Sequence, residues 1–498
     1  MKNKTFLYLS ILWLFSDGIP VLAQQKMTLT LQQAIMMAND SSLSVLRAQN
    51  NYLTSYWAYR TFKAERRPSL TMDLTPISYN RYITKRYDSE SNIDVYRPQQ
   101  AYSADGGLHL SQNFDLTGGT FYIDTDLQYL RNFGDNTYTQ FSSVPFRIGY
   151  SQSLLGFNSF KWDKRIEPER FEKERKGLIY AMEEISEEVV ANFFDVASAQ
   201  AQYQLAVESK ASADSLYIIG ERRFKIGSVT KADLLTLQLD VLNAKNSLEN
   251  ARIARKKATS VLAVFLNVDR NANINVVLPA PPAYDEVSVA QAVELARQNS
   301  PTLMEKKISV EEAQRELQRT RVENSFNASI NASVGFNQYG NRLLGAYKHP
   351  LEQDLVSVSV SIPLVDWGLR KGKLNKAKNN LNITCIDAKQ EEQNTEEEVT
   401  MTVNNFNIQK SLVESTLEAY HIANMAYRQI QERFIIGKAD VNAMMLAHSR
   451  QQEAQSNYIS ALQIFWGNYY KIRRLTLYDF EHSASLTDQF NFDRLTGK

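Results

Sequence analysis

The chain has 498 residues, of which 43% are hydrophobic and 22% charged, and its formal net charge is +1. This composition is typical of a folded protein of two to four domains, and the balanced charge gives no reason to expect a nucleic-acid-binding surface. The single cysteine, Cys385, excludes disulfides within the chain, and we expect it to be a small buried residue.

Residues 1–23 have the pattern of a secretory signal peptide. Two lysines precede an apolar run, Phe6–Phe15, and a small-residue site ends at Ala23. The run is too short to span ~30 Å of hydrocarbon, so cleavage after Ala23 is favoured over a membrane anchor. No other segment contains the roughly 20 apolar residues that a transmembrane helix needs.

The rest of the sequence contains the same pattern twice. Leu31–Ile35 is repeated as Val289–Val293, 258 residues later, whereas Arg223–Gly227 is repeated as Arg433–Gly437, 210 residues later. The first copy therefore holds about 48 additional residues between these two landmarks. The predicted domains are a first repeat at 24–278, a Pro-rich linker at 279–286, a second repeat at 287–480 and a C-terminal tail at 481–498.

Each copy opens with a predicted helix, at residues 32–67 and 289–324, and continues into alternating apolar and polar residues. The alternation covers residues 70–74, 144–150, 326–337 and 356–362. Stretches of about ten such residues are typical of membrane β-strands, although a soluble sheet with one wet face would give the same pattern. The signal peptide and the long flanking helices favour the membrane.

The simplest count gives about four strands per chain. The first copy also contains a second candidate hairpin near residues 106–130, where two alternating stretches flank the turn Thr117–Gly119. The sequence leaves open whether this hairpin joins a barrel or decorates its outer mouth.

Long helices with a heptad pattern follow the strands in both copies. The heptad positions, which are mostly apolar with polar interruptions at matching places, step by four and three residues. In the second copy they are Val399, Val403, Phe406, Lys410, Val413, Leu417, Tyr420, Asn424, Tyr427, Gln431 and Phe434, and in the first copy Val189, Phe193, Val196, Gln200, Tyr203, Val207, Lys210, Asp214, Tyr217, Glu221 and Phe224. Gly227 and Gly437 mark the turns into return helices. A helix over 161–226 would span on the order of 100 Å.

Four strands cannot close a barrel around a lumen, and open sheet edges in lipid leave backbone groups unsatisfied. The chain must therefore oligomerise, and its helices would continue from the membrane as a coiled-coil tube. The predicted fold class is an α+β membrane protein, internally duplicated, with transmembrane β-barrel strands continuous with a long antiparallel α-helical coiled-coil barrel.

The sequence resembles the TolC-like outer membrane efflux protein family over essentially the whole predicted mature chain. The resemblance rests on the duplicated opening helix, on the tips Phe224/Gly227 and Phe434/Gly437, and on the paired segments 153–157 and 362–368. It implies a homotrimer in the cell outer membrane with a 12-stranded barrel and a 12-helix periplasmic tunnel. It also implies that the tips dock a periplasmic adaptor (membrane fusion) protein and an inner-membrane transporter of the RND or ABC type.

The resemblance further implies an acidic aperture just after the tip glycines. Asp233 lies at a matching place in the first copy, and a helix-start residue is the equally weighted alternative. The second copy has Ala443 and Leu446 at the corresponding places, and Asp440, nearer the tip, could substitute for the missing acid.

The sequence contains no pattern for catalysis, a metal or a cofactor. The five histidines lack metal-ligand spacing, and we find no phosphate-binding loop and no nucleophile elbow. The predicted function is therefore a passive outer-membrane duct that exports small molecules or secreted polypeptides, with no enzyme activity. The alternative is a soluble periplasmic coiled-coil scaffold.

Overall fold

The computed structural model describes residues 26–133, 137–154, 156–280, 286–436 and 438–497, so the predicted signal peptide and Gly437 lie outside the described residues. The described chain is a helix-rich α+β protein that divides into two units. The helical unit comprises the described residues of Met1–Asn50, Leu178–Ala296 and Glu398–Asn491. The sheet unit comprises those of Asn51–Gly177, Arg297–Glu397 and Phe492–Lys498. Each unit draws on both halves of the sequence.

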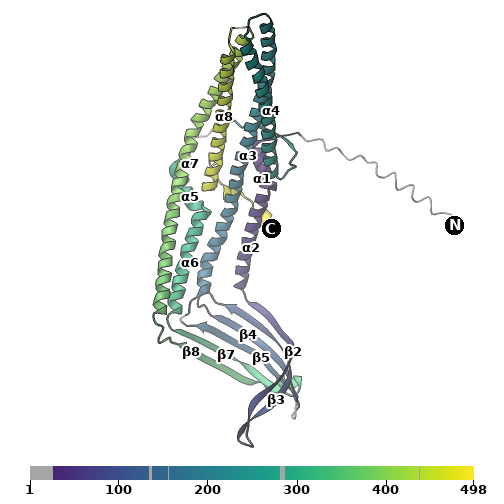
Figure 1. Cartoon of the computed structure of the whole chain (residues 1–498). Coiled ribbons are helices and arrows are strands. Elements are labelled where there is room, and N and C mark those ends of the chain that lie inside the picture. Colours follow the sequence, from purple (N-terminus) through teal and green to yellow (C-terminus); the bar gives the residue numbers. More distant parts are fainter. Residues whose placement is uncertain (1–25, 134–136, 155, 281–285, 437, 498) are drawn as a thin grey trace, which may run out of the picture. The chain divides into compact units, whose positions relative to one another are not determined.

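Within the described residues, six antiparallel strands form the sheet of the sheet unit, in the order β2–β3–β4–β5–β7–β8 (Figure 1). Their bounds are β2 Ser69–Asp88, β3 Ile93–Asn113, β4 Thr120–Phe133, β5 Tyr138–Ser153, β7 Asn327–Gly340 and β8 Leu351–Ser361. The simplest count of four strands is therefore wrong. The hairpin near residues 106–130 forms parts of β3 and β4 and joins this sheet.

The strands follow the predicted alternation because successive side chains point to opposite faces of a sheet. One irregularity lies in β5, where the register shifts by one residue between Ser143 and Phe146. Pro145 occupies this bulge, which suits a residue that has no N–H to donate to a neighbouring strand. A short 3-10 helix, η1 (Leu343–Tyr347), connects β7 to β8.

The helices of the sheet unit are held together by ion pairs. They are most of α2 (Leu43–Glu65), α6 (Pro301–Glu323) and the first parts of α3 (Ser159–Lys225) and α7 (Leu369–Ile435). The α3–α6 pairs are Asp163–Arg315, Arg165–Glu311, Glu169–Lys307, Arg170–Glu312 and Lys173–Glu305. Tyr59 of α2 also stacks on Phe171 of α3, with ring centroids 4.7 Å apart.

The helical unit contains the large apolar core of the chain. It is built from α1 (Leu31–Ser41), α4 (Lys231–Phe265), α5 (Val289–Asn299), α8 (Val441–Thr476) and the remaining parts of α3 and α7. Phe193 and Phe194 from the first half and Phe465 from the second are fully buried in it. Two parallel strands, β1 (Lys26–Thr30) and β6 (Asn273–Val277), pair at this core, which the sequence patterns did not predict.

The heptad pattern is confirmed where the helices enter this core. Val189, Phe193 and Val196 are buried in the first copy, as are their counterparts Val399, Val403 and Phe406 in the second. Further along α3 the predicted positions become partly exposed. The chain ends with β9 (Tyr478–Asp479), β10 (Ala484–Ser485), α9 (Leu486–Gln489) and α10 (Asp493–Thr496).

Two predictions about local structure are wrong. Each opening helix is broken, because Ser42 and Ser300 leave the helical conformation and cap the helix that follows, accepting bonds from Val45 N and Leu303 N. Cys385 is exposed on α7 and is not a core residue.

None of the helices in the part of the chain that the structure describes is long and apolar enough to cross a membrane.

Candidate functional site

The first helical tip, between α3 and α4, is closed by a glycine turn. Gly227 has φ +71°, and its N–H donates to the carbonyl of Phe224 at 3.0 Å, while Ser228 N donates to Arg223 O at 3.0 Å. A left-handed residue at a helix end is the usual place for glycine, since any Cβ there is strained. The tip is therefore fixed by its backbone, and Phe224 remains 40% exposed.

Asp233 belongs to the capping box that starts α4. Its carboxylate accepts from Thr230 N at 3.2 Å and from Thr230 Oγ1 at 2.7 Å, while its own N–H donates to Thr230 Oγ1 at 3.2 Å. This reciprocal pair satisfies two backbone N–H groups that the first turn of a helix leaves without partners. The geometry is that of a helix-start residue on an exposed tip.

The second tip, between α7 and α8, is arranged differently. Asp440 caps α8 by accepting from Ala443 N at 2.7 Å. Phe434 is only 5% exposed and forms a small cluster with Tyr427, Met444 and Ala447. Phe434 therefore anchors its own hairpin, whereas its counterpart Phe224 does not.

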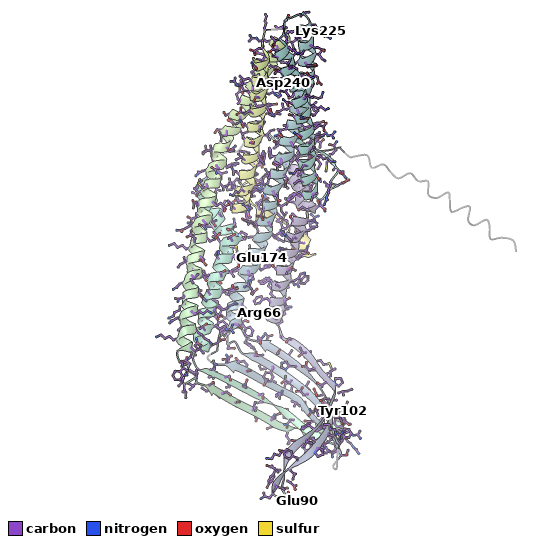
Figure 2. The ribbon with its side chains drawn as sticks, in the orientation of Figure 1. Arg66, Glu90, Tyr102, Glu174, Lys225 and Asp240 are labelled. Carbon is purple, nitrogen blue, oxygen red and sulfur yellow. The ribbon has the colours of Figure 1, made fainter. Side chains whose placement is uncertain are left out.

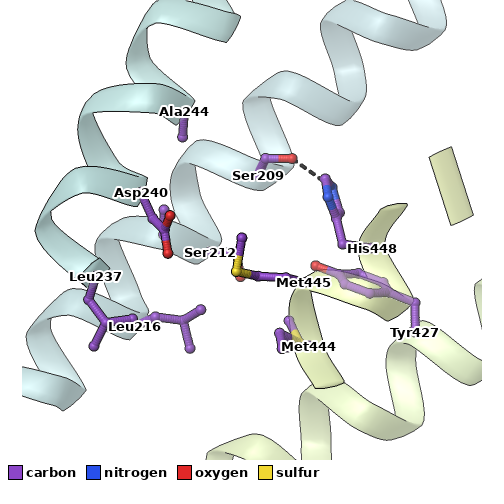
Figure 3. Close-up of a pocket in the computed structure, with 11 residues that line it drawn as sticks. Ser209, Ser212, Leu216, Leu237, Asp240, Ala244, Tyr427, Met444, Met445 and His448 are labelled. Carbon is purple, nitrogen blue, oxygen red and sulfur yellow. Dashed lines mark hydrogen bonds between the residues drawn. The ribbon is translucent and has the colours of Figure 1, made fainter. Parts of the chain in front are cut away.

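A cavity of about 170 Å³ lies between the helices near these tips (Figure 3). Its walls carry several polar or polarisable side chains, and Ser209 Oγ lies 2.7 Å from His448 Nε2. The lining residues are Ser209, Ser212, Ala213, Leu216, Leu237, Asp240, Ala244, Tyr427, Met444, Met445 and His448. Asp240 belongs to α4, and Figure 2 labels it below Lys225, the last residue of α3.

The cavity disfavours charge of either sign. Burial raises the pKa of the Asp240 carboxyl above its ordinary value. Burial also lowers the pKa of the His448 imidazole, against the opposing effect of Glu208. Both shifts favour the neutral form of the side chain. This is expected where a side chain is removed from water and its charged form loses hydration without gaining an equivalent set of hydrogen bonds.

A nearly buried ion network joins the two halves of the chain at the base of the helical unit. Arg473 of α8 donates from Nε and Nη2 to the two oxygens of Glu183 of α3, at 2.9 and 3.1 Å, and from Nη1 to Asp479 at 2.6 Å. Burial opposes the charge of Arg473, but the hydrogen bond and charge of Glu183 raise its pKa overall. Burial likewise opposes the Asp479 carboxylate, but Arg473 holds its pKa below the usual range.

Asp479, Glu481 and His482 are the potential metal-ligand group found in the described residues, with ligand atoms within 4.8 Å of one another. Asp479 is already engaged by Arg473 at 2.6 Å and lies 3.1 Å from His482 Nδ1. The adjacent guanidinium would repel a cation, so we assign no metal to this group.

The sheet has one apolar and one polar face. Large apolar side chains are exposed on the apolar face, among them Leu70, Met72, Leu108, Phe146, Val334, Val356 and Val358. On the other face Asp124 is buried between Arg147 and His109. The outer edges of β2 and β8 have no strand partner among the described residues.

Comparison with protein families explains this arrangement. The family model for outer membrane efflux proteins matches residues 100–268 and 292–464, which is more than half of the chain. The chain belongs to the outer membrane efflux protein family. It is therefore an efflux channel component of the outer membrane with a large periplasmic part, and it is not an enzyme.

Solved structures support the same fold for this efflux protein. A membrane protein from Pseudomonas aeruginosa has a TM-score of 0.64 at 15% identity, covering 90% of each chain. The CmeC outer membrane channel of Campylobacter jejuni has a TM-score of 0.65 at 13% sequence identity, and the match covers 93% of this chain and 90% of CmeC. The outer membrane protein VceC of Vibrio cholerae has a TM-score of 0.63 at 13% sequence identity, and the match covers 90% of this chain and 95% of VceC. Among curated proteins, none matches the sequence.

The sequence located the tips of this efflux protein but missed the charged groups that the fold buries partly or fully. Phe224, Gly227 and Asp233 lie together at one tip, and Phe434 and Asp440 lie at the other. Arg473, Asp240 and the role of Asp124 gave no sequence signal, because isolated charged residues in helical or alternating patterns are ordinarily solvated.

Proposed function

We propose that three copies of this efflux protein assemble into one passive duct, with the sheets closing a barrel in the outer membrane and the long helices forming a tunnel through the periplasm. The exposed apolar face of the sheet, bounded by two free edges, carries this proposal. Lipid covers such a face, and a neighbouring copy satisfies each edge, since an open sheet edge is costly in hydrocarbon.

The helices offer a second surface for neighbouring copies. On α4, Leu235, Leu239 and Leu242 are all more than half exposed and step by four and three residues. On α7, Met401, Ile408 and Ile422 are likewise exposed at multiples of seven. Such stripes pack against a partner helix in a coiled coil, so we infer that α4 and α7 contact other protomers.

We further propose that the two tips dock a periplasmic adaptor, which links the duct to an inner-membrane transporter. Phe224 offers an exposed aromatic anchor at the first tip. Gly227 shapes the turn that presents it. At the second tip, Phe434 and Gly437 are the predicted counterparts, and the burial of Phe434 leaves the first tip as the one with an exposed aromatic anchor. Asp233 and Asp440, whose carboxylates lie at the starts of the return helices, would contribute negative charge near the aperture.

The cargo proposed for this duct is small molecules or secreted polypeptides, and selection would come from the transporter because a passive duct contributes mainly its dimensions. CmeC and VceC, the structural relatives, are described as an outer membrane channel and an outer membrane protein.

Crosslinking from the tips tests the docking. Ser228→Cys or Lys438→Cys, each in a Cys385→Ser background and carrying a thiol-directed crosslinker, should capture a periplasmic adaptor in whole cells. Arg252→Cys, on an exposed part of α4 away from the tip, serves as the matched control. Capture from all three sites alike, or from none, would reject tip docking.

Detergent extraction tests the duct itself. We expect the protein in the outer-membrane fraction, with a mass of three chains by light scattering. Recovery as a soluble periplasmic protein would support the scaffold alternative.

A further inference from the structure

We propose that every one of the six described strands of each chain enters the barrel wall, so that three copies close a sheet of 18 strands and not the 12 implied by the family resemblance. The inference rests on the trimeric duct proposed above and deepens it. The strands in question are β3 and β4, which supply the difference between six strands and four.

Backbone pairing places β3 and β4 inside the sheet. β3 pairs with β2 from Ser69↔Ser111 to Asp88↔Ile93, and with β4 from Gln100↔Phe133 to Asn113↔Thr120. β4 then pairs with β5 along almost its whole length. The two strands therefore occupy interior positions, and removing them from the wall would expose the edges of both β2 and β5.

The faces of β3 and β4 match those of the other strands. Across the sheet, one row of paired positions is Leu70, Leu110, Ile123, Ile148, Val334 and Asp354, and an adjacent row adds Phe121, Tyr150, Ala332 and Val356. On the opposite face, the row next to Leu70 and Ile123 is Thr71, His109, Asp124, Arg147, Gly335 and Gln353. A decoration in water has no reason to keep the same apolar and polar sides as the wall.

Side chains on the polar face tie these strands to β5. Asp124 of β4 is 6% exposed and accepts from Arg147 of β5, with Nε at 3.1 Å and Nη2 at 2.7 Å. His109 of β3 contacts the other oxygen of the same carboxylate. The three charged or ionisable groups face away from the apolar side, which places them on the lumen side of a barrel wall.

Both strands are long enough to cross a bilayer. A membrane strand needs about 9–11 residues, and β3 has 21 while β4 has 14. β7 and β8, which the alternation predicted as membrane strands, have 14 and 11. β3 and β4 are therefore at least as long as β8, and their length gives no reason to exclude them from the barrel wall.

The additional strands change the size of the duct. Barrel diameter grows roughly in proportion to strand number, so 18 strands give a wall about 1.5 times as wide as 12. The outer-membrane section would then accept bulkier cargo than a 12-stranded member of the family admits.

Distances between spin labels measure this width. Val356→Cys in a Cys385→Ser background places one label on the exposed apolar face of β8 in each protomer. The matched variant lacks residues 89–137, which removes β3 and β4 and joins β2 to β5 in an antiparallel four-stranded sheet. In trimers of the full chain, the label-to-label distance should be about 1.5 times that in the deletion variant.

Electron cryomicroscopy of the unaltered trimer gives an independent strand count, which decides the question if the deletion variant does not fold. Eighteen strands support the inference. Twelve strands in a trimer, or equal label distances in the two proteins, would overturn it and leave the trimeric duct standing. An assembly that is not threefold would instead overturn the proposed trimer, and the 18-strand ring with it.

Discussion

The two ends of the helical unit are built from matching sequence but are stabilised differently. At the base, both halves contribute to one core, where Phe193 and Phe465 are fully buried and Arg473 bridges Glu183 and Asp479. At the tips the core is small, and of the two matching phenylalanines Phe434 is 5% exposed whereas Phe224 is 40% exposed. The difference shows that a repeated pattern gives the same backbone turn twice, whereas side-chain burial depends on the neighbouring helices.

The largest effect is expected at the base. Arg473→Met leaves the nearly buried Glu183 carboxylate without its guanidinium and removes the same cation from Asp479, so the free energy of unfolding should fall by about 3–5 kcal/mol. Thermal unfolding of the extracted protein measures the loss. Arg252→Met, which removes a 70% exposed side chain, is the control and should change stability by less than about 0.5 kcal/mol. Equal effects of the two variants would contradict the difference between base and surface.

The second effect separates the two tips. Phe434→Ala should cost about 3 kcal/mol and speed hydrogen exchange over residues 427–447, because it empties the cluster around Tyr427 and Met444. Phe224→Ala removes a side chain that is 40% exposed and should cost less than about 1 kcal/mol. If the two tips loosened equally, their inequality would be refuted.

The third prediction measures how much the left-handed backbone conformation of Gly227 contributes to the requirement for glycine at the first tip. Gly227→Ala meets no atom within 4 Å, so its expected cost of about 1 kcal/mol comes from the positive φ alone. Gly467→Ala also meets nothing within 4 Å but lies inside α8, where it should stabilise by about 0.5–1 kcal/mol. Chemical denaturation of both variants measures the sign, and the same sign in both would argue against a strained turn.

The smallest effect concerns the cavity near the tips and depends on pH. The pKa of His448 is lowered in the folded chain, so acidification from pH 7 through the unfolded value near 6.5 protonates the unfolded state first and lowers stability. His448→Gln should remove part of this loss when melting temperatures are compared at pH 7 and pH 5.5.

For Asp240, the expected change of stability with pH has the opposite sign. Its folded pKa is raised, so its charge lowers stability above that pKa, and the loss is recovered as the pH falls through it. Asp240→Asn should therefore raise the melting temperature at pH 7. A lower melting temperature in this variant would mean that the carboxylate is stabilising where it lies.

Several elements could be predicted from the sequence because they depend on local periodicity. The alternation at residues 326–337 and 356–362 predicted β7 and β8, the heptad pattern predicted the long helices, and the RFxIG pattern predicted the tips. The breaks at Ser42 and Ser300 were visible as matching serines but were not recognised as caps, since helix-forming residues surround them. These features need only neighbours within a few residues.

The contacts between segments that are distant in sequence became known only from the tertiary structure. The parallel pairing of β1 with β6, the place of β3 and β4 inside the sheet, the bridge from Arg473 to Glu183 and the burial of Phe434 but not Phe224 all join distant segments. Periodicity defines which face of an element is apolar, but it does not name the partner that covers that face. The partner depends on burial and electrostatic energies summed over the packed chain, and loop entropy changes too slowly with length to select one pairing over another.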